Sequence, residues 1–349
     1  GDVYKRQVLY NGKAGLIDLD LNQQQKVLNS YGYPMGLADY SAFILGGLPK
    51  QGQTLEEVKD LLLNEIKKLR AGEFDEKMLQ ANINNFKLYE LQSMESNEGR
   101  ADIFVNSFIN GTNWKDEVTA IDRMAKLTKE DIVAFADKYL KEDNYAVVYK
   151  KQGKDPNEKK MTKPEITPIV SNRDVASPFL TSIQENAVKP IEPVFLDFKK
   201  DMSQLTAKSD IPVLYKQNTT NDLFQLIYVF DMGNNNDKAL GTAFDYLEYL
   251  GTSDMTPEEL KSEFYRLACT FYVSPGNERT YVVLSGLNEN MPAAMQLFEK
   301  LLADAQANKE AYNNLVGDIL KARADAKLNQ GQNFSCLLYT SPSPRDVEE

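Results

Sequence analysis

The sequence predicts an α+β protein of two domains, in which repeated layers of mainly antiparallel sheet carry helices packed on one face. Two observations predict this class. In the first half, a strand-like run is followed by a group of amphipathic helices and then by a returning strand-like run, and a proline-rich connector at 151–194 separates this half from a second, similar one. The 349 residues, 42% of them hydrophobic, are enough to bury a sizeable core in two domains.

The first domain is expected over 8–150. Thr54 and Glu57 form a capping-box pattern that opens a strongly amphipathic helix, and Gly72 follows its last apolar residue as a helix stop. The remaining elements predicted here are helices over 15–29, 75–110 (with a break at 97–99), 114–127 and 128–140, and strands over 40–45 and 145–149.

The connector over 151–194 is predicted to be extended, because prolines interrupt any helical or strand period and lysines cluster at 150–163. The second domain is expected over 195–335. Its predicted elements are a hairpin of strands 212–216 and 222–230 around a turn at 218–221, and strands over 271–275 and 278–286. Helices are predicted over 242–250, from 256 onward, and over 291–305 and 309–330.

The stretch Thr242–Leu260 carries the most specific pattern in the chain. Apolar residues recur at spacings of three and four up to Leu250, and Gly251 stops this helix. Thr256 then caps a second helix that begins at Pro257. A helix, Gly-Thr, a short loop and a capped helix, followed by two strands and an amphipathic helix, resemble the insulinase/pitrilysin family of zinc peptidases. In that family the first helix carries the inverted zinc motif H-x-x-E-H.

The resemblance is to a degenerate copy of this motif, since the chain contains no histidine. Aligned on Gly-Thr, the three key positions fall on Thr242, Asp245 and Tyr246. Aligned on the similarity to H-Y-L-E-H, they fall on Asp245, Glu248 and Tyr249. Both alignments stay open, and neither set matches two imidazoles and a carboxylate. We therefore expect no catalytic residue, no metal site and no cofactor in this chain.

A further acidic zinc ligand of active family members lies on a helix that resembles 309–330, where Asp318 or Asp325 would match it. The sequence alone favours an exposed face of an amphipathic helix for both. Of the two cysteines, Cys269 is expected to be a buried thiol without a chemical role. The absence of histidine excludes a Ser-His or Cys-His nucleophile within the chain.

Composition excludes further classes. A net charge of -11 argues against nucleic acid as a partner, and no apolar run approaches the length of a membrane span. Both ends, 1–7 and 336–349, resemble translated linker scars and are left out of the fold prediction.

The resemblance implies a piece of a four-domain zinc endopeptidase. It covers the C-terminal part of the second domain, the connector and most of the third, non-catalytic domain. On this reading the chain forms chamber wall and hinge, peptide substrates and the other domains of the same polypeptide are its partners, and zinc lies in a first domain outside this sequence. The alternative is a non-catalytic core or scaffold subunit of the same fold in a larger assembly. An H-x-x-E-H motif upstream of Val8 would distinguish the two.

Overall fold

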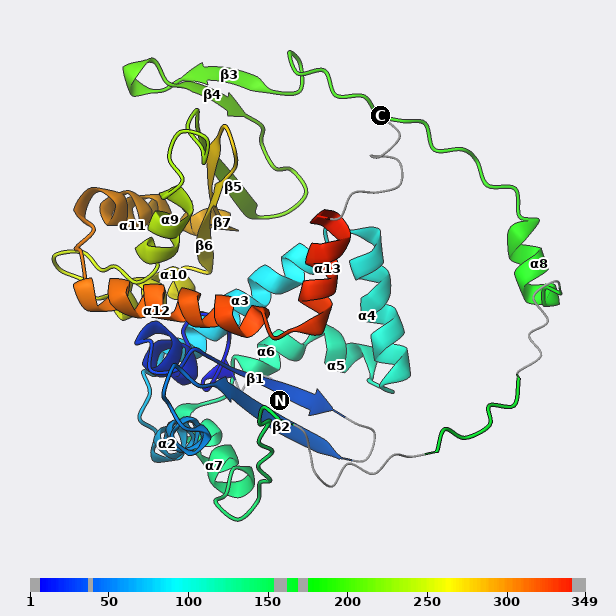
Figure 1. Cartoon of the computed structure of the whole chain (residues 1–349). Coiled ribbons are helices and arrows are strands. Elements are labelled where there is room, and N and C mark those ends of the chain that lie inside the picture. Colours follow the sequence, from blue (N-terminus) through cyan, green and yellow to red (C-terminus); the bar gives the residue numbers. More distant parts are fainter. Residues whose placement is uncertain (1–6, 37–39, 154–161, 169–174, 341–349) are drawn as a thin grey trace, which may run out of the picture. The chain divides into compact units, whose positions relative to one another are not determined.

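The computed structural model describes residues 7–36, 40–153, 162–168 and 175–340. The chain separates into two compact units: a large unit of Gly1–Val147 with Asn218–Glu349, and a connector unit of Val148–Gln217 (Figure 1). The two stretches predicted as separate domains therefore contribute to one compact unit. The domain boundaries at 150/151 and 194/195 stay a prediction.

The first half of the large unit forms one small sheet and a group of helices. Strands β1 (Asn29–Gly36) and β2 (Ser41–Leu48) pair antiparallel, with Asn29 opposite Leu48. The other elements are the π-helix η1 (Asp18–Gln23) and the helices α2 (Leu55–Ala71), α3 (Lys77–Ser93), α4 (Asn97–Ile109), α5 (Trp114–Val118), α6 (Ala120–Met124) and α7 (Lys129–Tyr139).

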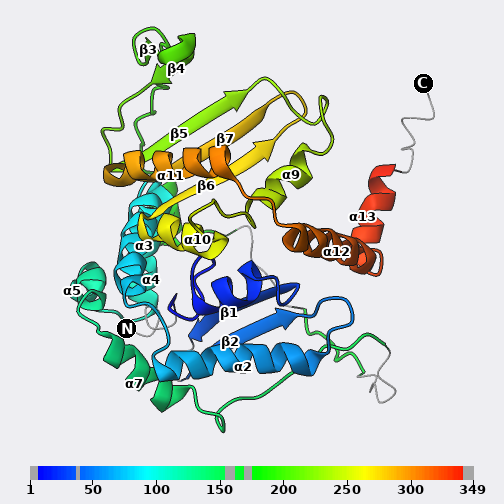
Figure 2. The same cartoon turned by 90° about the vertical axis from the view of Figure 1, so that its left-hand side faces the viewer.

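A hydrophobic core joins this sheet to α2, α7 and the N-terminal segment. Helix α2 runs along the β1–β2 sheet in Figure 2, and its capping box at Thr54 and left-handed stop at Gly72 match the sequence prediction. Val58 and Leu62 lie under Gly47 of β2. The fully buried members of this core are Val8, Leu9, Ile17, Leu21, Val27, Leu69, Ile132 and Ala136.

The second half of the large unit has a three-stranded antiparallel sheet in the order β5-β7-β6. Its elements are β5 (Leu223–Phe230), α9 (Leu240–Leu247), α10 (Pro257–Arg266), β6 (Cys269–Pro275), β7 (Thr280–Leu287), the short 3-10 helix η3 (Asn288–Asn290), α11 (Met291–Asp304), α12 (Lys309–Ala326) and α13 (Gln330–Thr340).

Helices α9, α10 and α11 pack on this sheet (Figure 2). Leu284 of β7 and Phe298 of α11 are almost completely buried at the centre of this core. Side chains of the opposite alternation, such as Ile227 and Tyr272, are about half exposed, at 47% and 54%. The sheet therefore buries one face under helices and leaves the other partly exposed at its edge strands, whereas Val283 of the central strand is buried on that second face too.

The connector unit contains only short elements. Strands β3 (Ser203–Thr206) and β4 (Pro212–Tyr215) form an antiparallel pair around the 3-10 helix η2 (Lys208–Asp210), and α8 spans Pro178–Gln184. Ser177 caps α8, with Pro178 in its first turn. Of these elements only α8 lies in the stretch 151–194 that was predicted to be an extended connector, and that prediction missed it. The strand predicted over 212–216 corresponds to β4.

Three further predictions are wrong. The helix over 15–29 ends early, because 29–36 is strand β1, paired with β2. The stretch 145–149 forms no strand. Strand 212–216 does not pair with 222–230: β4 pairs with β3 inside the connector unit, whereas β5 pairs with β7.

The predicted fold class is confirmed, since helices cover antiparallel sheets in an α+β arrangement. Among the described helices, none combines the length and the apolar character needed to cross a membrane.

Candidate functional site: a polar pocket at the end of helix α9

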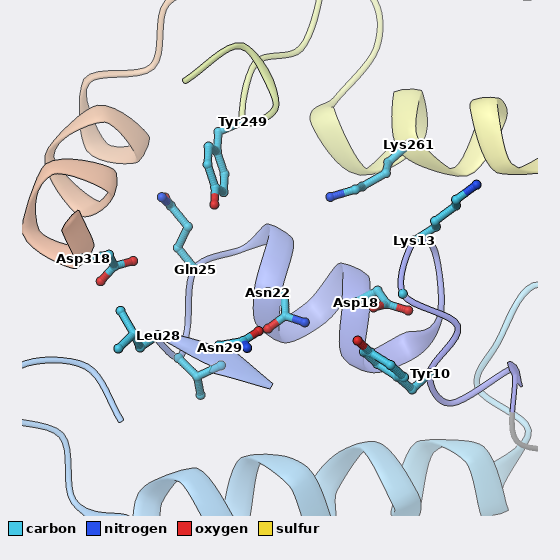
Figure 3. A pocket seen from close by; sticks show the side chains of 12 residues that line it. Tyr10, Lys13, Asp18, Asn22, Gln25, Leu28, Asn29, Tyr249, Lys261 and Asp318 are labelled. Carbon is cyan, nitrogen blue, oxygen red and sulfur yellow. The ribbon is translucent and has the colours of Figure 1, made fainter. Parts of the chain in front are cut away.

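The degenerate motif lies on α9 and in the turn that follows it. Thr242, Asp245 and Glu248 are exposed on this helix and its C-terminal end. The Tyr246 hydroxyl donates a 2.7 Å hydrogen bond to the Asn308 carbonyl and accepts one from the Asn308 amide, so it joins α9 to the start of α12. Tyr249 lies beyond the helix and points into a pocket (Figure 3).

The positions of neither alignment gather into a metal site. In the alignment on Gly-Thr, the side chains of Thr242 and Asp245 face solvent, and Tyr246 bonds to the start of α12. In the alignment on H-Y-L-E-H, only Tyr249 reaches the pocket. Within the described part of the chain, no group of three or more Cys, Asp or Glu side chains could hold a metal ion. Hydroxyl groups of Thr and Tyr beside dispersed carboxylates do not fit a tetrahedral zinc site.

The two acidic candidates on α12 differ in their surroundings. Asp318 lines the same pocket as Tyr249 and forms a 3.5 Å ion pair with Lys50. Asp325 pairs with Lys321 one helical turn earlier, at 2.6 Å, and its side chain is 54% exposed. Asp318 is therefore the acidic residue of α12 that the fold brings to the degenerate motif.

The pocket has a volume of 230 Å³ and a mostly polar lining from both halves of the large unit. Tyr10, Lys13 and Asp18 come from the N-terminal loop and η1, Gln25 from the segment before β1, and the other half supplies Tyr249, Lys261 and Asp318 (Figure 3). The complete lining is Tyr10, Gly12, Lys13, Asp18, Asn22, Gln25, Val27, Leu28, Asn29, Tyr249, Lys261 and Asp318.

Local hydrogen bonds set the shape of the N-terminal wall. One Asp18 oxygen accepts bonds from the Asn11 and Gly15 amides, at 3.0 and 2.9 Å, and closes the loop between them. Gly12, with φ of 79°, allows this turn. Gln25 is also left-handed, with φ of 51°, which is uncommon for a residue with a side chain and marks a constrained backbone at the pocket wall.

Burial dominates the electrostatics of the pocket. It raises the pKa of Asp18, although the amide hydrogen bonds and the Lys261 charge act in the opposite direction. Burial also raises the pKa of Asp318, opposed by Lys50, and lowers the pKa of Lys13. The pKa of Tyr249 is raised first by burial and then by the negative charges of Glu248, Asp318 and Asp245. Burial therefore opposes the charged form of each of these groups.

Two side-chain amides, of Gln25 in the pocket wall and of Gln23 beside it, bond the first half to the second. Gln23 donates through Nε2 to the Glu248 carbonyl at 2.9 Å and accepts at Oε1 from the Lys261 ammonium at 2.8 Å. Gln25 donates to the Ala311 carbonyl at 3.2 Å. Side-chain amides of the first half therefore bond to the C-cap carbonyl of α9, to the Lys261 side chain in the middle of α10 and to a carbonyl in the first turn of α12.

Sequence reasoning identified Tyr249 and Asp318 but missed the remaining pocket residues. Its only local signal was the Asn11–Gly12 turn, and nothing in the pattern around Asp18 or Lys261 connects residues so far apart along the chain.

No protein-family model matches the chain, and a search of curated proteins gives no match either. Among solved structures, the chain is similar to the periplasmic protease PqqL from Escherichia coli, with 12% identity and a TM-score of 0.36 over 98% of this chain and 39% of that one. It is also similar to the ferredoxin protease FusC in complex with Arabidopsis ferredoxin (10% identity, TM-score 0.36, 95% of this chain and 40% of that one). A protease from Helicobacter pylori matches with 13% identity and a TM-score of 0.28, over 42% of this chain and 33% of that one. The chain spans less than half the length of each of these three proteins.

Proposed function

We propose that this chain is a non-catalytic part of a zinc-dependent endopeptidase resembling insulinase and pitrilysin, in which it forms chamber wall and hinge for peptide substrates. The observation that carries the proposal is that the helices and loop of the family's zinc region are present, whereas the zinc-binding side chains are not. Helix α9, Gly251–Thr252 and the capped helix α10 keep the order of the family's zinc region.

Hydrogen bonds within the protein fix the loop between α9 and α10. The Thr252 amide donates to the Met255 carbonyl at 2.8 Å, and the Thr252 hydroxyl bonds to Asp254 at 2.8 Å. Thr256 and Glu259 then form the capping box of α10. These contacts close the loop and cap the N-terminus of α10 with groups of the protein itself. This supports a structural role for a region that, in active members of the family, holds zinc.

The first test measures zinc and peptide cleavage on the chain alone. We expect less than stoichiometric zinc after dialysis and no turnover of a fluorogenic peptide, because the motif positions offer no ligand set. Stoichiometric, tightly held zinc, or turnover that a chelator blocks, would contradict the proposal.

The second test adds the upstream polypeptide and the fourth domain. Recovery of zinc-dependent cleavage is expected for a peptidase. Recovery of a soluble complex without cleavage would instead favour the scaffold subunit.

A further inference from the structure

Several groups that face the pocket have unused hydrogen-bonding capacity. The hydroxyls of Tyr10 and Tyr249 have no hydrogen-bond partner among the described residues. The Lys261 ammonium bonds to Gln23 Oε1 and has two further N–H donors. Asp318 meets Lys50 at 3.5 Å, which leaves acceptor capacity on its carboxylate.

The charged groups are divided between two sides of the pocket. Lys261 and Lys13 lie on one side, together with Asp18, whereas Tyr249 and Asp318 lie on the other (Figure 3). The exposed carboxylates of Asp245 and Glu248 add negative charge near the Tyr249 side. A ligand that carries an anionic and a cationic group would therefore find a counter-charge for each.

The size of the pocket restricts the ligand further. Its 230 Å³ lies below the range of about 300–1,000 Å³ typical of sites for drug-sized molecules. Partly desolvated charges are unfavourable without partners. Asp318 already has Lys50 and Lys261 already has Gln23 as a partner, so a small ligand that gives each a second partner would stabilise them further, and an apolar ligand would not.

We propose that this pocket binds a small zwitterion, a free α-amino acid, with its carboxylate at Lys261 and its ammonium at Asp318. The two tyrosine hydroxyls donate or accept further hydrogen bonds along the ligand. Binding at this site is independent of whether the complete protein cleaves peptides, since every group involved belongs to this chain.

Calorimetric titration of the whole chain with glycine and L-serine, at constant ionic strength, tests the proposal. Acetate and methylamine each supply one of the two charges and serve as matched probes. We expect saturable binding of the amino acids, and affinities at least about ten-fold lower for the single-charge probes, as the loss of a hydrogen bond to a charged group predicts.

Single-residue variants test whether the amino acid binds in this pocket. Lys261→Met and Asp318→Asn should each lower the affinity for glycine by about ten-fold or more. Lys238→Met and Asp325→Asn, which change residues outside the pocket lining, should leave it unchanged. Thermal melts of all four variants separate loss of binding from loss of folding. Equal binding of acetate or methylamine, no saturable binding of either amino acid, or equal affinities in folded pocket and control variants would overturn the proposal.

Discussion

Glu65 of α2 is the most deeply buried carboxyl among the described residues, with 1% of its surface exposed. One oxygen lies 3.0 Å from the Lys68 ammonium, whereas the other has no hydrogen-bond partner. Lys68 also contacts Asp20 of η1 at 2.5 Å. Burial raises the pKa of Glu65, the Lys68 hydrogen bond opposes this shift, and the Asp20 charge adds to it.

Replacement of Glu65 by Gln should change how stability depends on pH. Because the folded-state pKa of Glu65 is raised, the folded protein holds this proton more tightly than the unfolded chain. The resulting stabilisation is present below the unfolded pKa and is lost as pH rises through the folded one. Urea denaturation should therefore show the free energy of unfolding of Glu65→Gln improving, relative to the wild type, from pH 4 to pH 8.

The control for this measurement is Glu56→Gln on the exposed side of the same helix. The difference in free energy of unfolding between Glu56→Gln and the wild type should vary less with pH than the difference for Glu65→Gln. A constant offset between Glu65→Gln and the wild type would mean that Glu65 titrates as it does in the unfolded chain.

At the scale of elements, helices were more predictable than strand pairs. The capping boxes at Thr54 and Thr256 each depend on only four consecutive residues. Both cap a helix, as predicted. Strand β1 has the sequence NSYGYPMG, in which Gly and Pro disfavour a strand, yet pairing with β2 imposes one. By contrast, 145–149 has strand-forming residues but no pairing partner in the structure. The strand propensity of a segment does not show whether another strand will pair with it.

Gly286, the second-last residue of β7, lies opposite Cys269 of β6, where the two strands approach each other closely. A Cβ atom there would lie 2.4 Å from the Ala268 carbonyl oxygen and 2.6 Å from the Cys269 sulfur. Gly286→Ala should therefore reduce the free energy of unfolding by roughly 1–3 kcal/mol, the range for overpacked sites.

Gly317→Ala on α12 is the matched control, because no atom beyond the backbone of its own helix lies within 4 Å of the position that a Cβ would take. The higher helix propensity of Ala should stabilise this variant by up to about 1 kcal/mol. Chemical denaturation of both variants gives the comparison. Equal effects would mean that backbone movement relieves the contact at Gly286.

At the scale of the whole molecule, side-chain amides connect regions that the connector separates in sequence. Asn85 Nδ2 donates to the Tyr265 carbonyl at 2.6 Å, and the Tyr265 hydroxyl donates to Asn82 Oδ1 at 2.6 Å in a buried contact. Asn and Gln on a helix resemble ordinary surface residues in a sequence. For this reason the sequence could not predict the pocket that forms where the halves meet.

Cleavage of the connector should therefore leave the large unit assembled. The described residues between Gln152 and Pro193 are almost all exposed and punctuated by prolines, so limited treatment with subtilisin, a protease of broad specificity, should cut first in this segment. The pieces should then elute together in size-exclusion chromatography with light scattering. Early cuts within Glu57–Leu69 would contradict this order of cleavage.

The buried contact at Tyr265 gives this association a specific test. Tyr265→Phe removes the hydroxyl and leaves the Asn82 amide, whose Nδ2 already has no partner, without its remaining bond. Loss of a buried hydrogen bond costs about 1–3 kcal/mol, so the nicked pieces should dissociate roughly five- to 150-fold more readily. Tyr272→Phe, on the exposed face of the β5-β7-β6 sheet, should not change their association. If the nicked wild-type pieces elute separately while each stays folded, the halves are independent domains, and the amide contacts contribute little to holding them together.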